Sequence, residues 1–208
     1  MVPKQRQVPA EDVLGALLPR FLPWSIANGL TDNCCIYATR AGISVFKYFG
    51  ISARPLAVGA ELISASLVRQ IADGRSPKDD TGYWHVDRCD PGARVVNIDP
   101  RKNTVPTANE SDWNGHLVIY LPGQVDRLVD LSFLQFWRPE FSFPRGPRVH
   151  TIQDISDGRW VWILPGGDQL TMWETPDNRG WLRQDDWRGS TTQRIAIARL
   201  IKVVEKAL

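Results

Sequence analysis

A stripe of apolar residues at helical spacing follows two adjacent cysteines near the start of the chain. The stripe consists of Ala38, Gly42, Val45 and Phe49. Residues three or four positions apart share one face of a helix, so the pattern predicts a largely buried helix over residues 34–49. Asp32 or Asn33 can cap its start, and Gly50 follows its end, where helices favour glycine.

Helical patterns also occur near both ends of the chain. An apolar segment over residues 13–18 is predicted to form a short helix that stops near Pro19 and Pro23, because proline does not continue a helix. The C-terminal segment predicts an amphipathic helix capped by Ser190 or Thr191. Its apolar face consists of Ile197, Leu200, Ile201, Val204 and Leu208.

Strand patterns dominate the rest of the chain. Runs of apolar and β-branched residues between turn formers predict strands over residues 51–58, 95–98, 116–121, 127–131, 149–152, 160–164 and 169–173. A further helix is predicted over residues 60–72 and a surface excursion over 73–91. Residues 138–147 are predicted to form an irregular loop. Helices followed by a mostly antiparallel sheet and a closing helix indicate an α+β fold.

Composition and charge narrow the class of protein. The 208 residues, 43% of them hydrophobic, suit one domain over residues 1–208. A net charge of +2 is too mild to indicate a nucleic-acid partner. No run approaches the roughly 18 apolar residues that a membrane helix needs, so we expect no membrane partner. The N-terminus lacks the apolar core of a signal peptide, and we expect a cytoplasmic location.

The three cysteines direct attention to thiol chemistry. Their number is odd and too small for a disulfide framework. Cys34 and Cys35 are adjacent, so a strain-free disulfide between them is implausible. Thiols in a reducing cytosol are more often catalytic or inert than bridged. The question is therefore whether one of them is a nucleophile.

Three side chains at the ends of predicted elements suit nucleophilic catalysis. Cys35 lies in the first turn of a helix, whose dipole and free amides favour thiolate and can hold an oxyanion. His116 opens a strand directly after Gly115, which leaves room around the imidazole. Asp130 lies in the other arm of a predicted hairpin and can orient His116 by a hydrogen bond. The alternative interpretation is an inert buried thiol, a structural histidine and a turn-capping aspartate.

The segments around these side chains resemble the transglutaminase-like superfamily. In that family a catalytic cysteine begins a buried helix, and a Gly-Ile-Pro-Ala-Arg-like segment ends it. Here Cys35 lies in the first turn of the predicted helix, and Gly-Ile-Ser-Ala-Arg occupies residues 50–54. Trp-Asn-Gly-His, ending at His116, and Leu-Val-Asp, ending at Asp130, are similar to the family's His and Asp strands. The resemblance covers about residues 30–135.

The resemblance implies a papain-like fold and a cysteine-dependent hydrolase or acyltransferase. The expected catalytic triad is Cys35, His116 and Asp130, acting on an amide or peptide-type bond of a peptide or protein substrate. No cofactor is required by this chemistry. Two departures stand out. Ser52 replaces the family's proline, and Cys34 stands where the family often has glycine, which makes Cys34 a competing nucleophile.

Helical geometry favours Cys35 over Cys34 as the nucleophile. Cys34 shares the face of Ala38 and Gly42 and is expected to pack inward. Cys35 is rotated by about 100° from that face and is expected to point toward a cleft. Its distance in sequence from Gly50 also matches the family's spacing.

Residues 138–208 match no family motif and are expected to supply specificity. Trp160 and Trp162 would share one sheet face, either as core packing or as an apolar substrate groove. A non-catalytic binding protein that uses the aromatic-rich segment 138–188 is the alternative function. Gln135 could line the cleft, donate to an oxyanion or make a surface contact.

One further group of side chains could bind a metal ion. His85 and Cys89 lie among acidic residues. Tetrahedral zinc sites usually show paired Cys or His motifs, and a second pair is missing here. We therefore expect no metal site.

Overall fold

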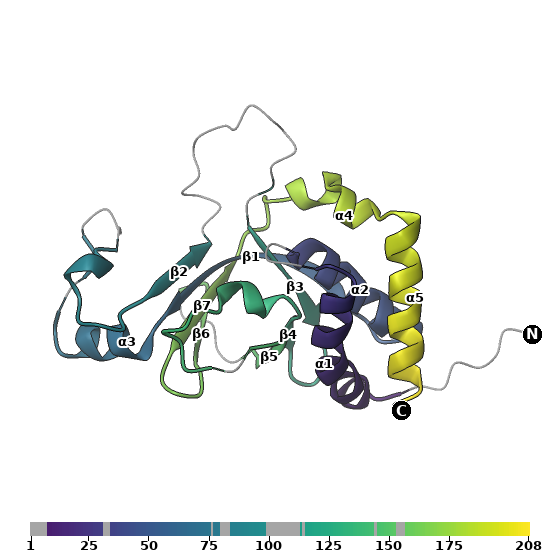
Figure 1. Cartoon of the computed structure of the whole chain (residues 1–208), viewed down its shortest axis with the longest axis horizontal. Coiled ribbons are helices and arrows are strands. Elements are labelled where there is room, and N and C mark those ends of the chain that lie inside the picture. The colour runs from purple at the N-terminus through teal and green to yellow at the C-terminus, as the bar shows by residue number, and fades with distance from the viewer. Residues whose placement is uncertain are drawn as a thin grey trace, which may run out of the picture.

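A computed structural model of the chain describes residues 8–30, 34–75, 77–79, 84–98, 113, 115–143, 145–152 and 157–208. The fold is α+β, as predicted, with helices from the N-terminal and C-terminal parts of the chain packed against one face of an antiparallel sheet (Figure 1). The helices are α1 (Ala10–Ala27), α2 (Cys35–Tyr48), α3 (Ala65–Ala72), α4 (Asp185–Arg188) and α5 (Thr191–Glu205), with 3-10 turns η1 (Val86–Arg88), η2 (Phe133–Phe136) and η3 (Gly180–Arg183).

Seven strands of the described chain form one sheet. The strands are β1 (Arg54–Ile63), β2 (Val95–Ile98), β3 (His116–Leu121), β4 (Arg127–Asp130), β5 (Arg148–Thr151), β6 (Arg159–Ile163) and β7 (Gln169–Glu174). Their order is β5-β4-β3-β1-β7-β6, and β2 pairs with β1. All pairings are antiparallel. Apart from β1, the predicted strands, including the hairpin of β3 and β4, are confirmed with small changes of boundary.

The sheet curves until its two edge strands meet. Trp162 of β6 donates a hydrogen bond of 2.8 Å from Nε1 to the carbonyl oxygen of Thr151 in β5. The rings of Trp162 and His150 pack with centroids 4.8 Å apart. The sheet is therefore nearly closed and encloses an apolar cluster. This cluster includes Val58, Leu128, Phe133, Phe136, Trp160 and Met172.

Helix α1 extends through both prolines that were expected to end it. Proline lacks an N–H and crowds the preceding turn, so local preference opposes helix at Pro19 and Pro23. Tertiary contacts outweigh this cost. Phe21 is buried between the two prolines, and Trp24 donates a hydrogen bond of 3.1 Å from Nε1 to the carbonyl of Ala196 in α5. Burial against α5 thus overrides the local stop signal.

Strand β1 is also longer than the sequence predicted. The segment 60–72 was expected to be helical, but residues 60–63 belong to β1 and α3 begins only at Ala65. Residues 60–63 pair with β2 on one side and with β7 on the other. Two ladders of hydrogen bonds from distant segments therefore override the local pattern.

Helix α2 forms over nearly the predicted range and packs on β3. Thr39 donates a buried hydrogen bond of 2.8 Å from Oγ1 to the carbonyl of Leu117. Tyr37 donates one of 3.2 Å to the carbonyl of Gln193 in α5. Helix α5 begins with the capping box of Ser190 and Gln193, which confirms the predicted cap. These contacts set the N-terminus of α2 beside the start of β3.

Helix α3 and strand β2 lie in a lobe away from α1, α2 and α5 (Figure 1). Buried Asp168 ties this lobe to the sheet, because its Oδ1 accepts a 2.8 Å hydrogen bond from the amide of Ala65. The predicted surface excursion over 73–91 is partly described and contains η1. Residues 76 and 80–83 lie outside the described residues.

Candidate active site

His116 is completely buried at the start of β3. Its ring packs edge-on against Phe136, with centroids 4.9 Å apart. Gly115 precedes it. This glycine was expected to leave room around the imidazole, but other side chains fill the space where its Cβ atom would lie. A Cβ atom at Gly115 would lie 2.7 Å from Asn178 Nδ2 and 2.9 Å from Trp113 Cζ2. The glycine therefore admits the indole of Trp113 and the amide of Asn178.

Asp130 holds one side of the His116 ring. His116 Nε2 donates a hydrogen bond of 2.6 Å to Asp130 Oδ2, and both side chains are fully buried. The other carboxylate oxygen accepts hydrogen bonds from the Ser132 amide at 3.0 Å and from Ser132 Oγ at 3.1 Å. The hydrogen bond predicted across the hairpin is confirmed. The contribution of Ser132 was missed, although Asp-x-Ser after a strand is a familiar turn pattern in which the side chain accepts from the backbone.

Cys35 is the first residue of α2 and lies beside His116. Its thiol is within hydrogen-bonding reach of the His116 ring. Cys34, the N-cap residue of α2, makes no side-chain capping hydrogen bond, and the amides of the first turn adjoin Cys35. Asp32 and Asn33, the predicted caps, lie outside the described residues. Cys35 is buried, at 5% exposure, in a small cluster with Ile36, Leu117 and Trp181. The expectation that Cys35 opens into a cleft is therefore corrected, because aromatic residues near the C-terminus cover this end of the helix.

Cys34 occupies a different environment. It is partly buried and packs against the helical cluster of α1, α2 and α5, as the stripe of apolar residues predicted. Burial, with the neighbouring thiol of Cys35, raises the pKa of the Cys34 thiol to about 12. None of the three cysteines is in a disulfide.

Burial and the neighbouring groups have opposite effects on the pKa of His116. Burial by itself lowers the pKa of His116, because a charged imidazole loses hydration. The Asp130 carboxylate and the thiol of Cys35 outweigh burial and raise this pKa to about 10. The His116 imidazole therefore has a high proton affinity although it is buried.

Two groups near Cys35, His116 and Asp130 were not foreseen in these positions. Gln135, in η2, places its side-chain nitrogen Nε2 against His116 Nδ1. Trp181 and Trp187 pack edge to face at 4.5 Å beside the Cys35 cluster. Helical or strand periodicity gives no signal for either contact, because they come from a short turn and from a segment far away in sequence.

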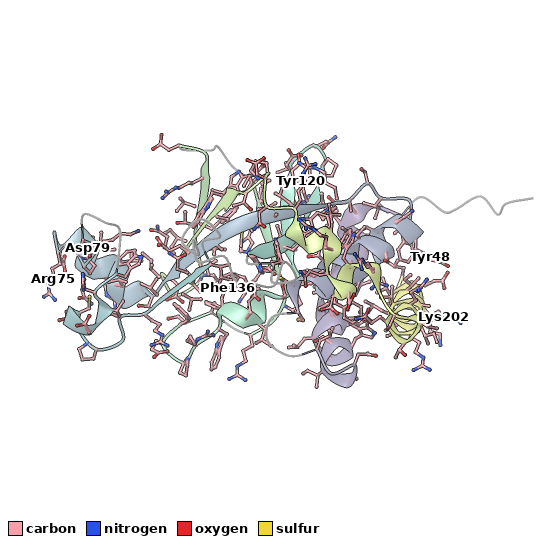
Figure 2. The ribbon with its side chains drawn as sticks, turned by 90° about the horizontal axis from the view of Figure 1, so that it is seen from above. Tyr48, Arg75, Asp79, Tyr120, Phe136 and Lys202 are labelled. Carbon is pink, nitrogen blue, oxygen red and sulfur yellow. The ribbon has the colours of Figure 1, made fainter. Side chains whose placement is uncertain are left out.

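The other predicted candidates lie elsewhere. His85 pairs with Asp79 at 2.9 Å in the outlying lobe, and Figure 2 shows Arg75 and Asp79 far from Phe136. No group of three or more His, Cys, Asp or Glu side chains in the described part of the chain is placed to bind a metal ion. Trp160 is buried and Trp162 packs on His150, which confirms core packing for this pair.

Comparisons with models of protein families, with curated proteins and with solved structures find no match to this chain. The resemblance to the transglutaminase-like superfamily therefore stays a prediction from the sequence motifs. Within the described residues, no helix is both long enough and apolar enough to cross a membrane.

Proposed function

We propose that this protein is a cysteine-dependent hydrolase or acyltransferase that acts on an amide-type bond. The observation that carries the proposal is the buried hydrogen bond of 2.6 Å between His116 and Asp130, with the Cys35 thiol at the same imidazole ring. Nucleophile, base and orienting acid thus meet at one point. We further propose that the fold is papain-like and related to the transglutaminase-like superfamily.

The chemistry begins with proton transfer from the thiol to the imidazole. Asp130 accepts from His116 Nε2, which leaves Nδ1 to take the proton of Cys35. The negative carboxylate stabilises the imidazolium that forms, and Ser132 keeps the carboxylate in place. A thiolate at the N-terminus of α2 is further stabilised by the helix dipole.

The thiolate then attacks the carbonyl carbon of the substrate. In the proposed mechanism, the amides in the first turn of α2, next to Cys35, stabilise the oxyanion of the tetrahedral intermediate. His116 returns its proton to the leaving amine as the C–N bond breaks, which leaves a thioester on Cys35. Water or an amine attacks this thioester, giving hydrolysis in the first case and acyl transfer in the second.

The aromatic segment near the C-terminus is the proposed source of specificity. Trp181 is buried against Cys35, and Trp113 and Trp187 pack on the same cluster. Such surroundings favour an apolar group next to the scissile bond of a peptide or protein substrate. Exclusion of water by these rings also strengthens the electrostatic contacts within the site.

The proposal is tested with p-nitrophenyl acetate, an activated acyl donor. After acid quenching, peptide mass spectrometry is expected to find acetylated Cys35 in the wild-type protein. Cys35→Ala should lose this adduct, and His116→Ala or His116→Gln should slow its formation by about 10²-fold or more. Cys89→Ala is the matched control, since Cys89 lies in the outlying lobe. Circular dichroism checks that each variant is folded.

The rate of acetylation without His116 tests the proposed catalytic triad. Acetylation that continues at the same rate without His116 would contradict the triad and leave the non-catalytic binding protein as the better interpretation. Addition of glycinamide distinguishes the two enzyme classes. Acetylglycinamide as the main product indicates an acyltransferase, whereas acetate indicates a hydrolase.

A further inference from the structure

Gln135 and Cys35 both lie beside the ring of His116. Nε2 is engaged by Asp130 at 2.6 Å, which leaves Nδ1 for other partners. The Gln135 carboxamide lies against Nδ1. The Cys35 thiol also lies within hydrogen-bonding reach of the ring. Because Nε2 is occupied, the thiol and the carboxamide must both use Nδ1.

A ring nitrogen offers only one in-plane hydrogen bond. Neutral Nδ1 has one lone pair, and protonated Nδ1 has one N–H. A carboxamide fits either state, because its NH₂ donates to the lone pair and its oxygen accepts from the N–H after a rotation of the amide. Gln135 therefore competes with the thiol in the neutral state and with the thiolate in the charged state. The direction of the competition does not depend on the orientation of the amide.

The local structure holds the backbone of Gln135 and leaves its side chain partly accessible. Arg138 donates a hydrogen bond of 2.9 Å from Nη1 to the Gln135 carbonyl, and the next residue, Phe136, packs on the His116 ring. The Gln135 side chain is half-buried, whereas His116 beneath it is fully buried. A group that enters from solvent on this side meets the carboxamide before it meets Nδ1.

We propose that Gln135 is a positioning residue that covers Nδ1 of His116 in the resting protein, and that an incoming acyl substrate displaces it. This inference rests on the proposed function. When the carboxamide leaves, the S–H bond of Cys35 breaks and an N–H bond forms at Nδ1. The electron pair stays on sulfur as thiolate, so the step needs no other reactant. Thiolate formation is thereby linked to the presence of substrate.

The test is the pH dependence of Cys35 alkylation by iodoacetamide, mapped by peptide mass spectrometry. Gln135→Ala and the shorter Gln135→Asn should move the midpoint of alkylation down by about 0.5–1 pH unit, the equivalent of one hydrogen bond. Below the midpoint, alkylation should be about three- to tenfold faster. Gln169→Ala is the matched control. Gln169 lies at one end of β7, whereas Glu174 at the other end pairs with Val58, which is also the cross-strand neighbour of His116.

The other titratable groups near the pair are the same in all these variants. They are Cys34 at the N-cap of α2, Asp130 on β4, His150 on β5 and Asp186 on α4. A midpoint that stays unchanged or moves upward in both Gln135 variants overturns the inference. If the Gln135 variants change only the melting temperature and do not move the alkylation midpoint downward, Gln135 has a structural role alone, and the inference is overturned as well.

Two further measurements separate this inference from the proposed function. His116→Ala should slow alkylation of Cys35. If it does and the Gln135 variants do not shift the midpoint, only the inference fails. If alkylation does not depend on His116, the proposed function fails and the inference with it. The ¹⁵N chemical shift of His116 Nδ1 should also change in Gln135→Ala, because this nitrogen exchanges its partner.

Discussion

His116 and His150 are both buried near the carboxylate of Asp130, yet their pKa values shift in opposite directions. The direct hydrogen bond to Asp130 and the thiol of Cys35 overcome burial at His116 and raise its pKa to about 10. At His150, burial lowers the pKa to about 4, and the more distant Asp130 does not compensate. His150 Nε2 has no hydrogen-bond partner among the described residues. The Asp130 carboxylate thus raises the proton affinity of the histidine that it contacts directly and does not offset burial at the other.

His150 should make the protein sensitive to acid. Its folded pKa of about 4 lies below the ordinary value of 6.5, so the unfolded chain binds the proton more tightly. Stability is therefore complete above pH 6.5 and is lost as the pH falls toward 4. Between pH 7 and pH 5, the unfolding free energy of His150→Phe should therefore decrease by about 2 kcal/mol less than that of the wild-type protein.

Urea unfolding at the two pH values measures this difference. Phe suits the site because His150 already packs between Phe133 and Trp162. The ring contacts are then kept and the unpartnered Nε2 is removed. An equal acid sensitivity in His150→Phe and the unmodified protein would place the sensitivity on another group.

Asp130→Asn should disable the site without unfolding it. The amide oxygen can still accept the hydrogen bonds of Ser132, which turns the NH₂ group toward His116 Nε2. Nε2 must then accept, the ring proton moves to Nδ1, and Nδ1 can no longer take the proton of Cys35. We expect acetylation of Cys35 by p-nitrophenyl acetate to fall by about 10²- to 10⁴-fold. Stopped-flow release of p-nitrophenol measures it, and Ser132→Ala, which keeps the carboxylate, should lose far less.

The two adjacent cysteines should differ sharply in reactivity. The pKa of Cys34 is raised to about 12, so its thiolate is scarce at neutral pH. Between pH 7 and 9, iodoacetamide should therefore label Cys35 well before Cys34. Cys34→Ala should leave the labelling of Cys35 nearly unchanged. Faster labelling of Cys34 than of Cys35 would show that the assignment of Cys35 as the nucleophile is wrong.

Two glycines should respond in opposite ways to alanine. A Cβ atom at Gly59 in β1 would lie 2.2 Å from the indole of Trp173, its cross-strand neighbour, which is a rigid and buried ring. Gly59→Ala should cost about 1–3 kcal/mol of unfolding free energy. Gly15 is exposed in α1 with no atom within 4 Å of such a Cβ, so Gly15→Ala should add about 0.5–1 kcal/mol. Thermal and urea unfolding of the pair measure both effects.

Local patterns were sufficient for several elements. Helix α2, the hairpin of β3 and β4 and the capping box of α5 follow from periodicity, turn formers and caps that lie within each segment. His116 and Asp130 are 14 positions apart on the two arms of a single hairpin, so a turn near residues 122–125 already predicts that the two side chains lie close together. Helix α1 and strand β1 were predicted too short, because α5, β2 and β7 support them from far away in sequence.

The sequence by itself determined the α+β class, the hairpin that joins His116 to Asp130 and the place of Cys35 in the first turn of a helix. Only the tertiary structure decided that Cys35 is buried beside His116 and that Gln135 lies against Nδ1. The physical reason is that these contacts join side chains of separate elements. Their distances depend on how the helices and the sheet pack together, and no local pattern contains that information.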